Sequence, residues 1–275
     1  MLKMGPALRA FGNTGQANDV DLALGRCLVT PAMLQRVVTD PTHCAAVAAA
    51  MRGEQPSSAR FDDILVREGN VTQIICDYAE VEYPGNDIVE KALRMVQAKR
   101  GVVTIHDRFA PKIALPQLFN FFYRYNKVAE EEGRIPVKLW QTAGQENWRG
   151  WDAEFLPTET GVINCDFSQV MRATDITGRP FLLDMDQQMT WAKEQGGDGI
   201  TSVEQITLLF IHSIIEFGRP LWGGGTVRCC NSCGSGDSLD VYWDADGGFG
   251  VGDWSCSDQD WNIGAVPRKC LVLGA

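Results

Sequence analysis

The sequence predicts a mixed α+β fold, with a main body of alternating helices and strands followed by a small β-rich module that carries cysteines. Residues 21–141 alternate between helical and strand-like segments, which is typical of α/β or α+β domains. Five of the nine cysteines then fall within residues 229–275, among short segments of alternating polarity. A chain of 275 residues, 45% hydrophobic, has enough apolar material for a core.

Three parts are expected along the chain. Residues 1–28 lack an apolar period and are interpreted as an N-terminal arm. Residues 29–221 form the α+β main domain, and residues 226–275 form the small β-rich Cys/Trp module. The glycines at 223–225 separate the last two parts as a hinge.

The first elements of the main body are expected to be helices. Thr30-Pro31 and Asp40-Pro41 each place a proline at the first helical position behind a capping residue, and the second helix runs to Ala50. A third helix covers Arg60 to Arg67. The β-branched run from Val71 to Cys76 predicts a strand.

Helices and strands alternate in the middle of the chain. A helix begins at Asn86 and ends near Ala98, shortly before a glycine. A strand follows at Val102 to Ile105, then a long helix rich in aromatic residues at Leu115 to Glu131. Ile135 to Trp140 predicts a third strand.

The second half of the main body contains a strand and two helices. Gly161 to Val170 has strand character, and Leu183 to Gln195 has helical character. Ser202, with a glutamine three residues later, forms a capping box for the apolar helix Ile206 to Phe217. Apolar residues occupy every face of that helix, so it is expected to be buried.

The C-terminal module is expected to contain three strands, at Thr226 to Cys230, Leu239 to Trp243 and Phe249 to Trp254. The segment 244–248 is rich in aspartate and glycine and predicts a hairpin turn between the last two strands.

The C-terminal thiols are the candidate chemistry. Cys230 and Cys233 have the Cys-x2-Cys spacing with which a tight turn presents two thiolates to one ion. Cys256 and Cys270 bring the predicted metal set to four thiolates, which fits zinc or an iron–sulfur cluster. Disulfides and unbonded thiols remain alternatives, because the second Cys-x2-Cys pair typical of zinc sites is absent.

Other reactive residues favour structural roles. Cys76 lies among apolar residues, as do Cys27, Cys44 and Cys165, and is interpreted as a small buried hydrophobe. His212 lies inside the apolar helix and is interpreted as a hydrogen-bonded core residue. No phosphate-binding loop occurs in the sequence, and no catalytic residues are predicted.

Charge and hydropathy limit the partners. The formal net charge of −10 argues against nucleic-acid binding and against docking on anionic lipid. The longest apolar run, of 12 residues, is too short to cross a membrane, and the N-terminus lacks the apolar core of a signal peptide. We therefore expect synthesis in the cytoplasm, no membrane contact and other protein subunits as partners, in a homo- or hetero-oligomer.

These observations favour a non-catalytic structural component of a large assembly, such as a phage virion or tail protein, with a thiol-bonded C-terminal module. An enzyme of unknown class and a cytosolic metal-binding interaction module are the alternatives.

Overall fold

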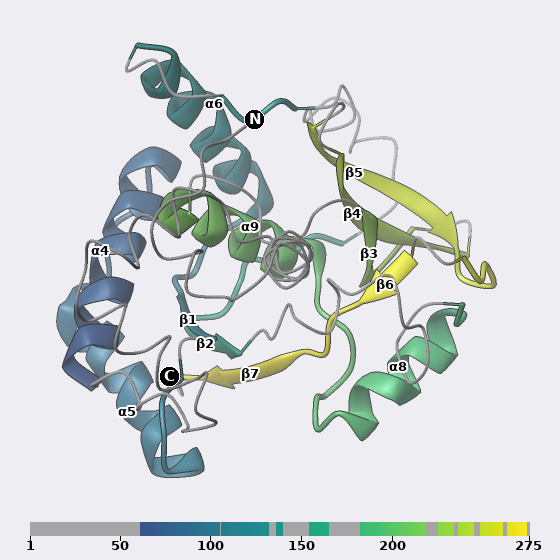
Figure 1. The fold of residues 1–275 in the computed structure, drawn as a ribbon, viewed down its shortest axis with the longest axis horizontal. Helices are drawn as coiled ribbons and strands as arrows, with labels where there is room; N and C mark the ends of the chain where they lie inside the picture. The colour runs from purple at the N-terminus through teal and green to yellow at the C-terminus, as the bar shows by residue number, and fades with distance from the viewer. Residues whose placement is uncertain are drawn as a thin grey trace, which may run out of the picture. The chain divides into compact units, whose positions relative to one another are not determined.

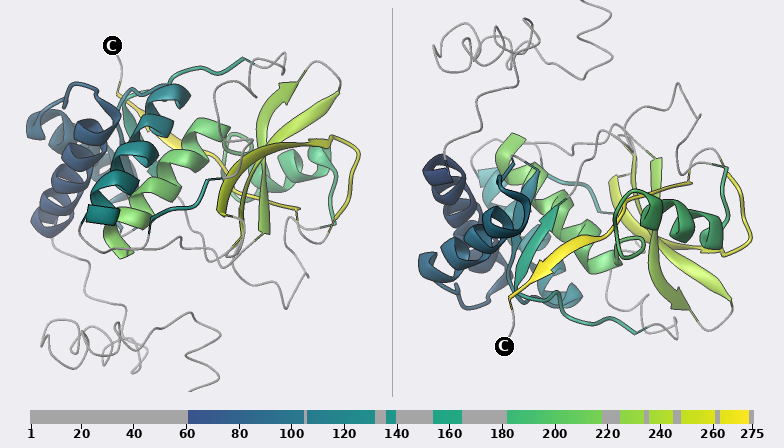
Figure 2. Two further views of the ribbon diagram at one scale, coloured as in Figure 1. Left: turned by 90° about the horizontal axis from the view of Figure 1, so that it is seen from above. Right: turned by 90° about the horizontal axis from the view of Figure 1, so that it is seen from below.

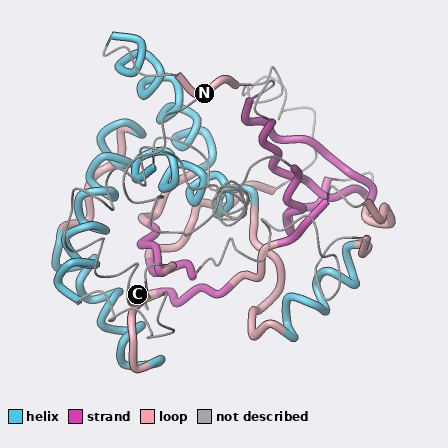
Figure 3. Tube along the Cα trace, in the orientation of Figure 1, coloured by secondary structure: helices cyan, strands magenta, loops and turns pink. Residues whose placement is uncertain are grey.

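The chain divides into two compact units, Met1–Ser58 and Ala59–Ala275, and the described residues all belong to the second unit. The computed structural model describes residues 61–104, 106–131, 136–139, 154–164, 182–217, 225–233, 236–244, 248–260 and 263–273. This part of the chain contains five helices and seven strands in two sheets, and the strands concentrate toward the C-terminus. Figure 3 distinguishes the helices from the strands by colour. The predicted mixed α+β fold is confirmed.

The first described elements are the helices α4 (Phe61–Ala79) and α5 (Asn86–Arg100). The strand expected at Val71 to Cys76 is wrong, because this run continues α4. Val71 and Ile75 lie one helical turn apart and are both buried in the main core, so packing outweighs the β preference of branched side chains. The end of α5 has the expected glycine, since Gly101 has a φ of 80° and its N–H donates to Gln97 O.

The first sheet consists of β1 (Asp107–Ala110), β2 (Gly161–Asn164) and β7 (Lys269–Val272), in the order β1-β2-β7 with antiparallel pairing. The strand expected at Val102 to Ile105 is wrong for its described residues, because 102–104 are irregular and the first strand begins at Asp107. The last strand comes from the far end of the chain, so the C-terminal segment completes a sheet begun in the main body.

Two helices form the centre of the core. The helix α6 has the predicted bounds (Leu115–Glu131), and α9 (Val203–Phe217) contains the predicted apolar helix. The capping box is present, because Ser202 N donates to Gln205 Oε1 at 3.1 Å and Gln205 N donates to Ser202 Oγ at 3.3 Å. In Figure 1, α9 lies between α4 and the strands of the second sheet.

The second sheet contains β3 (Gly225–Cys233), β4 (Asp237–Asp244), β5 (Gly248–Ser255) and β6 (Ile263–Ala265), in the order β5-β4-β3-β6. The pairs β3–β4 and β4–β5 are antiparallel, which confirms the expected hairpin, whereas β6 is parallel to β3. The helix α8 (Met185–Glu194) lies beside this sheet (Figure 2).

Strand alternation gives the second sheet two buried faces. Val227 and Cys229 pack in the main core with α6 and α9. Cys230 instead packs against the cluster formed by Trp191 of α8 and Ala265 of β6. The sheet is therefore enclosed between α6 and α9 on one face and α8 on the other.

The remaining expectations concern boundaries and undescribed residues. Within 136–139 the structure has only an isolated bridge, Leu139 to Phe249, in place of the expected strand. The arm at 1–28, the two helices expected after Thr30 and Asp40, and residues 165–170 of the expected strand lie outside the described residues. The domain boundaries at 28, 221 and 226 stay predictions. None of the described helices combines the length and apolar character needed to span a bilayer.

Candidate metal centre

The four cysteines of the predicted metal set occupy different surroundings. Cys230 lies on β3 and faces α8, whereas Cys270 lies on β7 and accepts a hydrogen bond at 3.2 Å from Gln205 Nε2. The thiol of Cys256 follows β5 and lies 3.3 Å from Met185 Sδ. Among the described residues no three of these four sulfurs lie within 4.8 Å of one another. The structure does not gather three of these thiols at one point, and the four-cysteine site stays a prediction.

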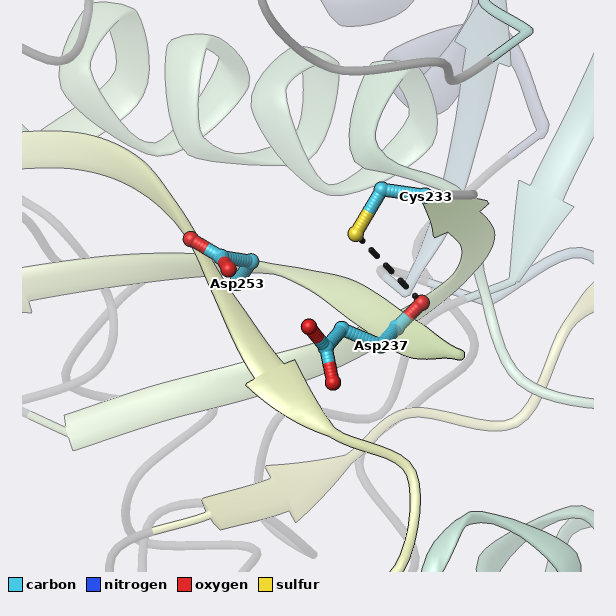
Figure 4. A group of neighbouring side chains, drawn as sticks. All are labelled: Cys233, Asp237 and Asp253. Carbon is cyan, nitrogen blue, oxygen red and sulfur yellow. Dashed lines mark hydrogen bonds between the residues drawn. The ribbon is translucent and has the colours of Figure 1, made fainter. Parts of the chain in front are cut away.

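The structure gathers a different set of ligand atoms around one of these thiols. The sulfur of Cys233 and one carboxylate oxygen each of Asp237 and Asp253 all lie within 4.8 Å of one another (Figure 4). This is the single group of three or more metal-ligating side chains in the part of the chain that the structure describes. We call Cys233, Asp237 and Asp253 the metal group, because together they could hold a metal ion.

Strand pairing explains how three separate strands supply this group. Cys233, at the end of β3, pairs with Asp237 at the start of β4, and Asp253 on β5 pairs with Leu239 on β4. Asp237 and Leu239 are two residues apart, so their side chains project from the same face of β4. The hairpin register thus brings the thiol and both carboxylates to one corner of the sheet.

The corner is buried on one side and open on the other. Cys233 is buried, and its Sγ lies 3.5 Å from the backbone oxygen of Asp237. Asp237 is half-buried and Asp253 is exposed. A cation can therefore reach the group from solvent along the carboxylates and meet the thiol at the inner end.

The distances between the three ligand atoms are close to those between ligand atoms around a bound ion. With Zn–S near 2.3 Å and Zn–O near 2.1 Å, ligand atoms around a tetrahedral ion lie about 3.4–3.8 Å apart. Because the three ligand atoms lie within 4.8 Å of one another, side-chain movements of about 1 Å would bring them to these separations. The backbone need not rearrange.

The other C-terminal thiols are held in their protonated form. Burial raises the pKa of Cys270 to about 11, and burial also raises the pKa of Cys230 and of Cys256. Because the thiolate is the reactive species, these surroundings suppress nucleophilic chemistry at all three positions.

His212 belongs to a buried polar network in the main body. Its Nε2 contacts the backbone oxygen of Phe109 at 3.0 Å, and burial lowers its pKa to about 4. Nearby, Arg108 bridges the carboxylates of Glu68 and Glu216 at 3.1 and 2.7 Å. The prediction of a hydrogen-bonded core histidine is confirmed, and the network ties β1 to α4 and α9.

The sequence identified one member of the metal group and missed two. Asp237 and Asp253 were not among the predicted metal ligands, because a carboxylate in a module rich in aspartate carries little information by itself. Their signal is positional. Asp237 stands four residues after Cys233 across a turn, and the hairpin from β4 to β5 returns Asp253 to the same corner.

Comparison of the chain with protein-family models, with curated proteins and with solved structures found no match.

Proposed function

We propose that this chain is a non-catalytic metal-binding structural protein in which a zinc ion ties together β3, β4 and β5. The observation that carries the proposal is the convergence of one thiol and two carboxylates, from three strands, within 4.8 Å. An ion held by all three side chains cross-links the strands and stabilises the folded state by its binding free energy.

The ligand types favour zinc over an iron–sulfur cluster. Clusters are held by four cysteine thiolates, or by two with two histidines, whereas this group has one thiol. Calcium and magnesium prefer oxygen ligands alone. Zinc accepts sulfur and carboxylate oxygen in one tetrahedral shell, so it fits this set best.

The proposed structural role is membership of a larger protein assembly. Structural zinc sites are normally closed by four protein ligands, and this chain supplies three of them at the corner. Because Asp253 is exposed, the fourth position faces outward, where a side chain of a neighbouring subunit can complete the shell. Metal binding and subunit contact are then linked at one place.

Zinc titration of the full chain tests the metal site. We expect one zinc per chain by elemental analysis and calorimetry after removal of adventitious metal. Cys233→Ser and Asp253→Asn should each weaken binding by more than about 100-fold, because loss of a mere supporting residue costs about 10–100-fold. Asp186→Asn, an exposed carboxylate on α8, is the matched control and should leave binding unchanged.

Cys256→Ser distinguishes this group from the four-cysteine site. The proposed ligands do not include Cys256, so this variant should bind zinc like the natural sequence. Full zinc binding by Cys233→Ser would refute the proposal, and loss of binding in Cys256→Ser would point to the four-thiol set.

A further inference from the structure

A cavity of about 1030 Å³ opens between the first sheet and the start of α9, and the metal group does not line it. Its walls come from β2, β7, the end of β3 and the segment 154–160. Leu156 gives it apolar surface, as do Ile163 and Val272 on the sheet face that also carries Cys270. This volume is at the upper end of the range of small-molecule sites, about 300–1,000 Å³.

One carboxylate oxygen in the lining of this cavity lacks a hydrogen-bond partner. Glu204, the second residue of α9, lines the cavity and is 1% exposed, and its Oε1 makes no hydrogen bond. Burial raises the pKa of this carboxyl above its ordinary value, although its hydrogen bonds with Ser202, Asn231 and its own backbone N–H act in the opposite direction. A buried acceptor without a donor is costly, so this atom favours a ligand that brings an N–H or O–H group.

The start of α9 does not favour an anion here. The N–H of Val203 already donates to Asn231 Oδ1 at 2.8 Å, and the N–H of Gln205 donates to Ser202 Oγ. Helix N-termini bind anions through such N–H groups, and these two are occupied.

The remaining polar residues of the cavity complete the chemical description. The charged lining residues besides Glu204 are two carboxylates, Glu154 and Glu159, and two cations, Lys112 and Arg268. With Glu204 ionised, acids outnumber bases. The thiols of Cys230 and Cys270 also line the cavity and, being protonated, are neutral walls instead of nucleophiles.

We propose that this cavity binds a small amphipathic amine, whose ammonium group donates to Glu204 Oε1 and whose apolar body packs against Leu156, Ile163 and Val272. The ammonium supplies the missing donor and also pairs with the buried carboxylate. A charge-assisted hydrogen bond of this kind is about twice as strong as a neutral one.

Calorimetry with three probes of similar size tests the chemistry on the full chain. The probes are phenethylamine, neutral 2-phenylethanol and anionic phenylacetate. We expect saturable binding of the amine with a Kd in about the millimolar range for nine non-hydrogen atoms. The alcohol and the anion should bind at least about 10-fold more weakly, because they lack the charged donor. Absence of amine binding, or equal binding of the alcohol, would overturn the proposal.

Two variants locate the probe. Glu204→Gln keeps the shape of the side chain but removes its charge, and it should weaken amine binding at least about 10-fold. Glu159→Gln removes an exposed charge from the same cavity and should change the Kd by less than about 2-fold, because solvent and salt screen it. Equal effects of the two changes would show that only net charge matters and would contradict the proposed contact.

A measurement on the natural sequence covers the case in which Glu204→Gln fails to fold. Bound phenethylamine should slow alkylation of Cys230 and Cys270 by iodoacetamide, mapped by mass spectrometry, and leave Cys256 unaffected. Unchanged rates at the two cavity thiols under saturating amine would place the probe elsewhere. Cys233→Ser should bind the amine normally, which separates this cavity from the metal group.

Discussion

At the scale of single residues, the most demanding pair is Arg228 and Asp240, which lie opposite each other on β3 and β4 and are 0% and 1% exposed. The Nη2 of Arg228 donates to the backbone oxygens of Ser255 and Asp258 at 3.2 and 2.9 Å. Both carboxylate oxygens of Asp240 lack a hydrogen-bond partner. Burial lowers the pKa of Arg228 and raises the pKa of Asp240 to about 7, so desolvation outweighs their mutual attraction.

This raised pKa predicts a stability that declines as the pH rises. The folded state holds the Asp240 proton up to about pH 7, whereas the unfolded chain releases it near the ordinary value of 3.8. The contribution is therefore complete below about pH 4, declines between pH 4 and 7, and is absent above that range. About three pKa units correspond to a difference of up to about 4 kcal/mol.

Denaturant unfolding of Asp240→Asn between pH 4 and 8 tests this contribution. The substitution should flatten the decline of the free energy of unfolding, and the slope is the quantity to compare because Asn also removes the charge facing Arg228. Asp186→Asn, on the exposed surface of α8, should keep the slope of the natural sequence. An unaltered slope in Asp240→Asn would assign the pH dependence to other groups.

At the scale of elements, α9 connects the two halves of the described core. It packs against α4, α6 and strands of both sheets, and its side chains from Ile206 to Ile214 are buried. Leu209, which is 1% exposed, has no route for a charged group to reach water.

Leu209→Asp should therefore cost at least about 3–5 kcal/mol in the free energy of unfolding, from lost apolar packing and a buried charge. Chemical denaturation measures this loss, and a melting temperature close to that of the natural sequence would contradict the buried position. Val66→Asp on α4 is the control, because Val66 is 62% exposed and the same change there should cost about 0.5 kcal/mol or less.

The success of sequence reasoning differs between elements for physical reasons. The capping box at Ser202 and the alternating strands of the second sheet are local signals, and the structure bears them out. The segment Val71 to Cys76 has a strong β preference, yet both its apolar positions one turn apart pack against the core as a helix. Tertiary packing decides such short apolar runs, and sequence periodicity alone does not resolve them.

At the scale of the whole molecule, pairing between strands far apart in the sequence decides where the C-terminal thiols lie, and the sequence could not show this pairing. Cys270 was grouped with the other C-terminal thiols, but its strand pairs with β2, so Ile163 lies opposite Cys270 in the first sheet. The cavity likewise draws its walls from segments between residues 112 and 273. The C-terminal thiols thus lie in different surroundings. Cys233 belongs to the metal group, whereas Cys230 and Cys270 line the cavity.

The proposed assembly role makes a prediction about the boundary at Ser58. Residues 59–275 form a compact unit of their own, so a fragment of these residues should fold with the circular dichroism and melting temperature of the full chain. The predicted N-terminal arm, residues 1–28, has little apolar periodicity. Ordering such an arm would cost about 1–2 kcal/mol per residue, so the proposed assembly role requires the surface of a neighbouring subunit to offset this cost.

We therefore expect the full chain to form oligomers in light scattering coupled to size-exclusion chromatography, and the metal-free fragment 59–275 to remain a folded monomer. The zinc-loaded form of both should be compared, because the proposed open coordination position offers a second contact that the fragment retains. A fragment that assembles as fully as the intact chain, with or without zinc, would show that the first 58 residues do not carry the subunit interface. An unfolded fragment would show instead that the core extends into them.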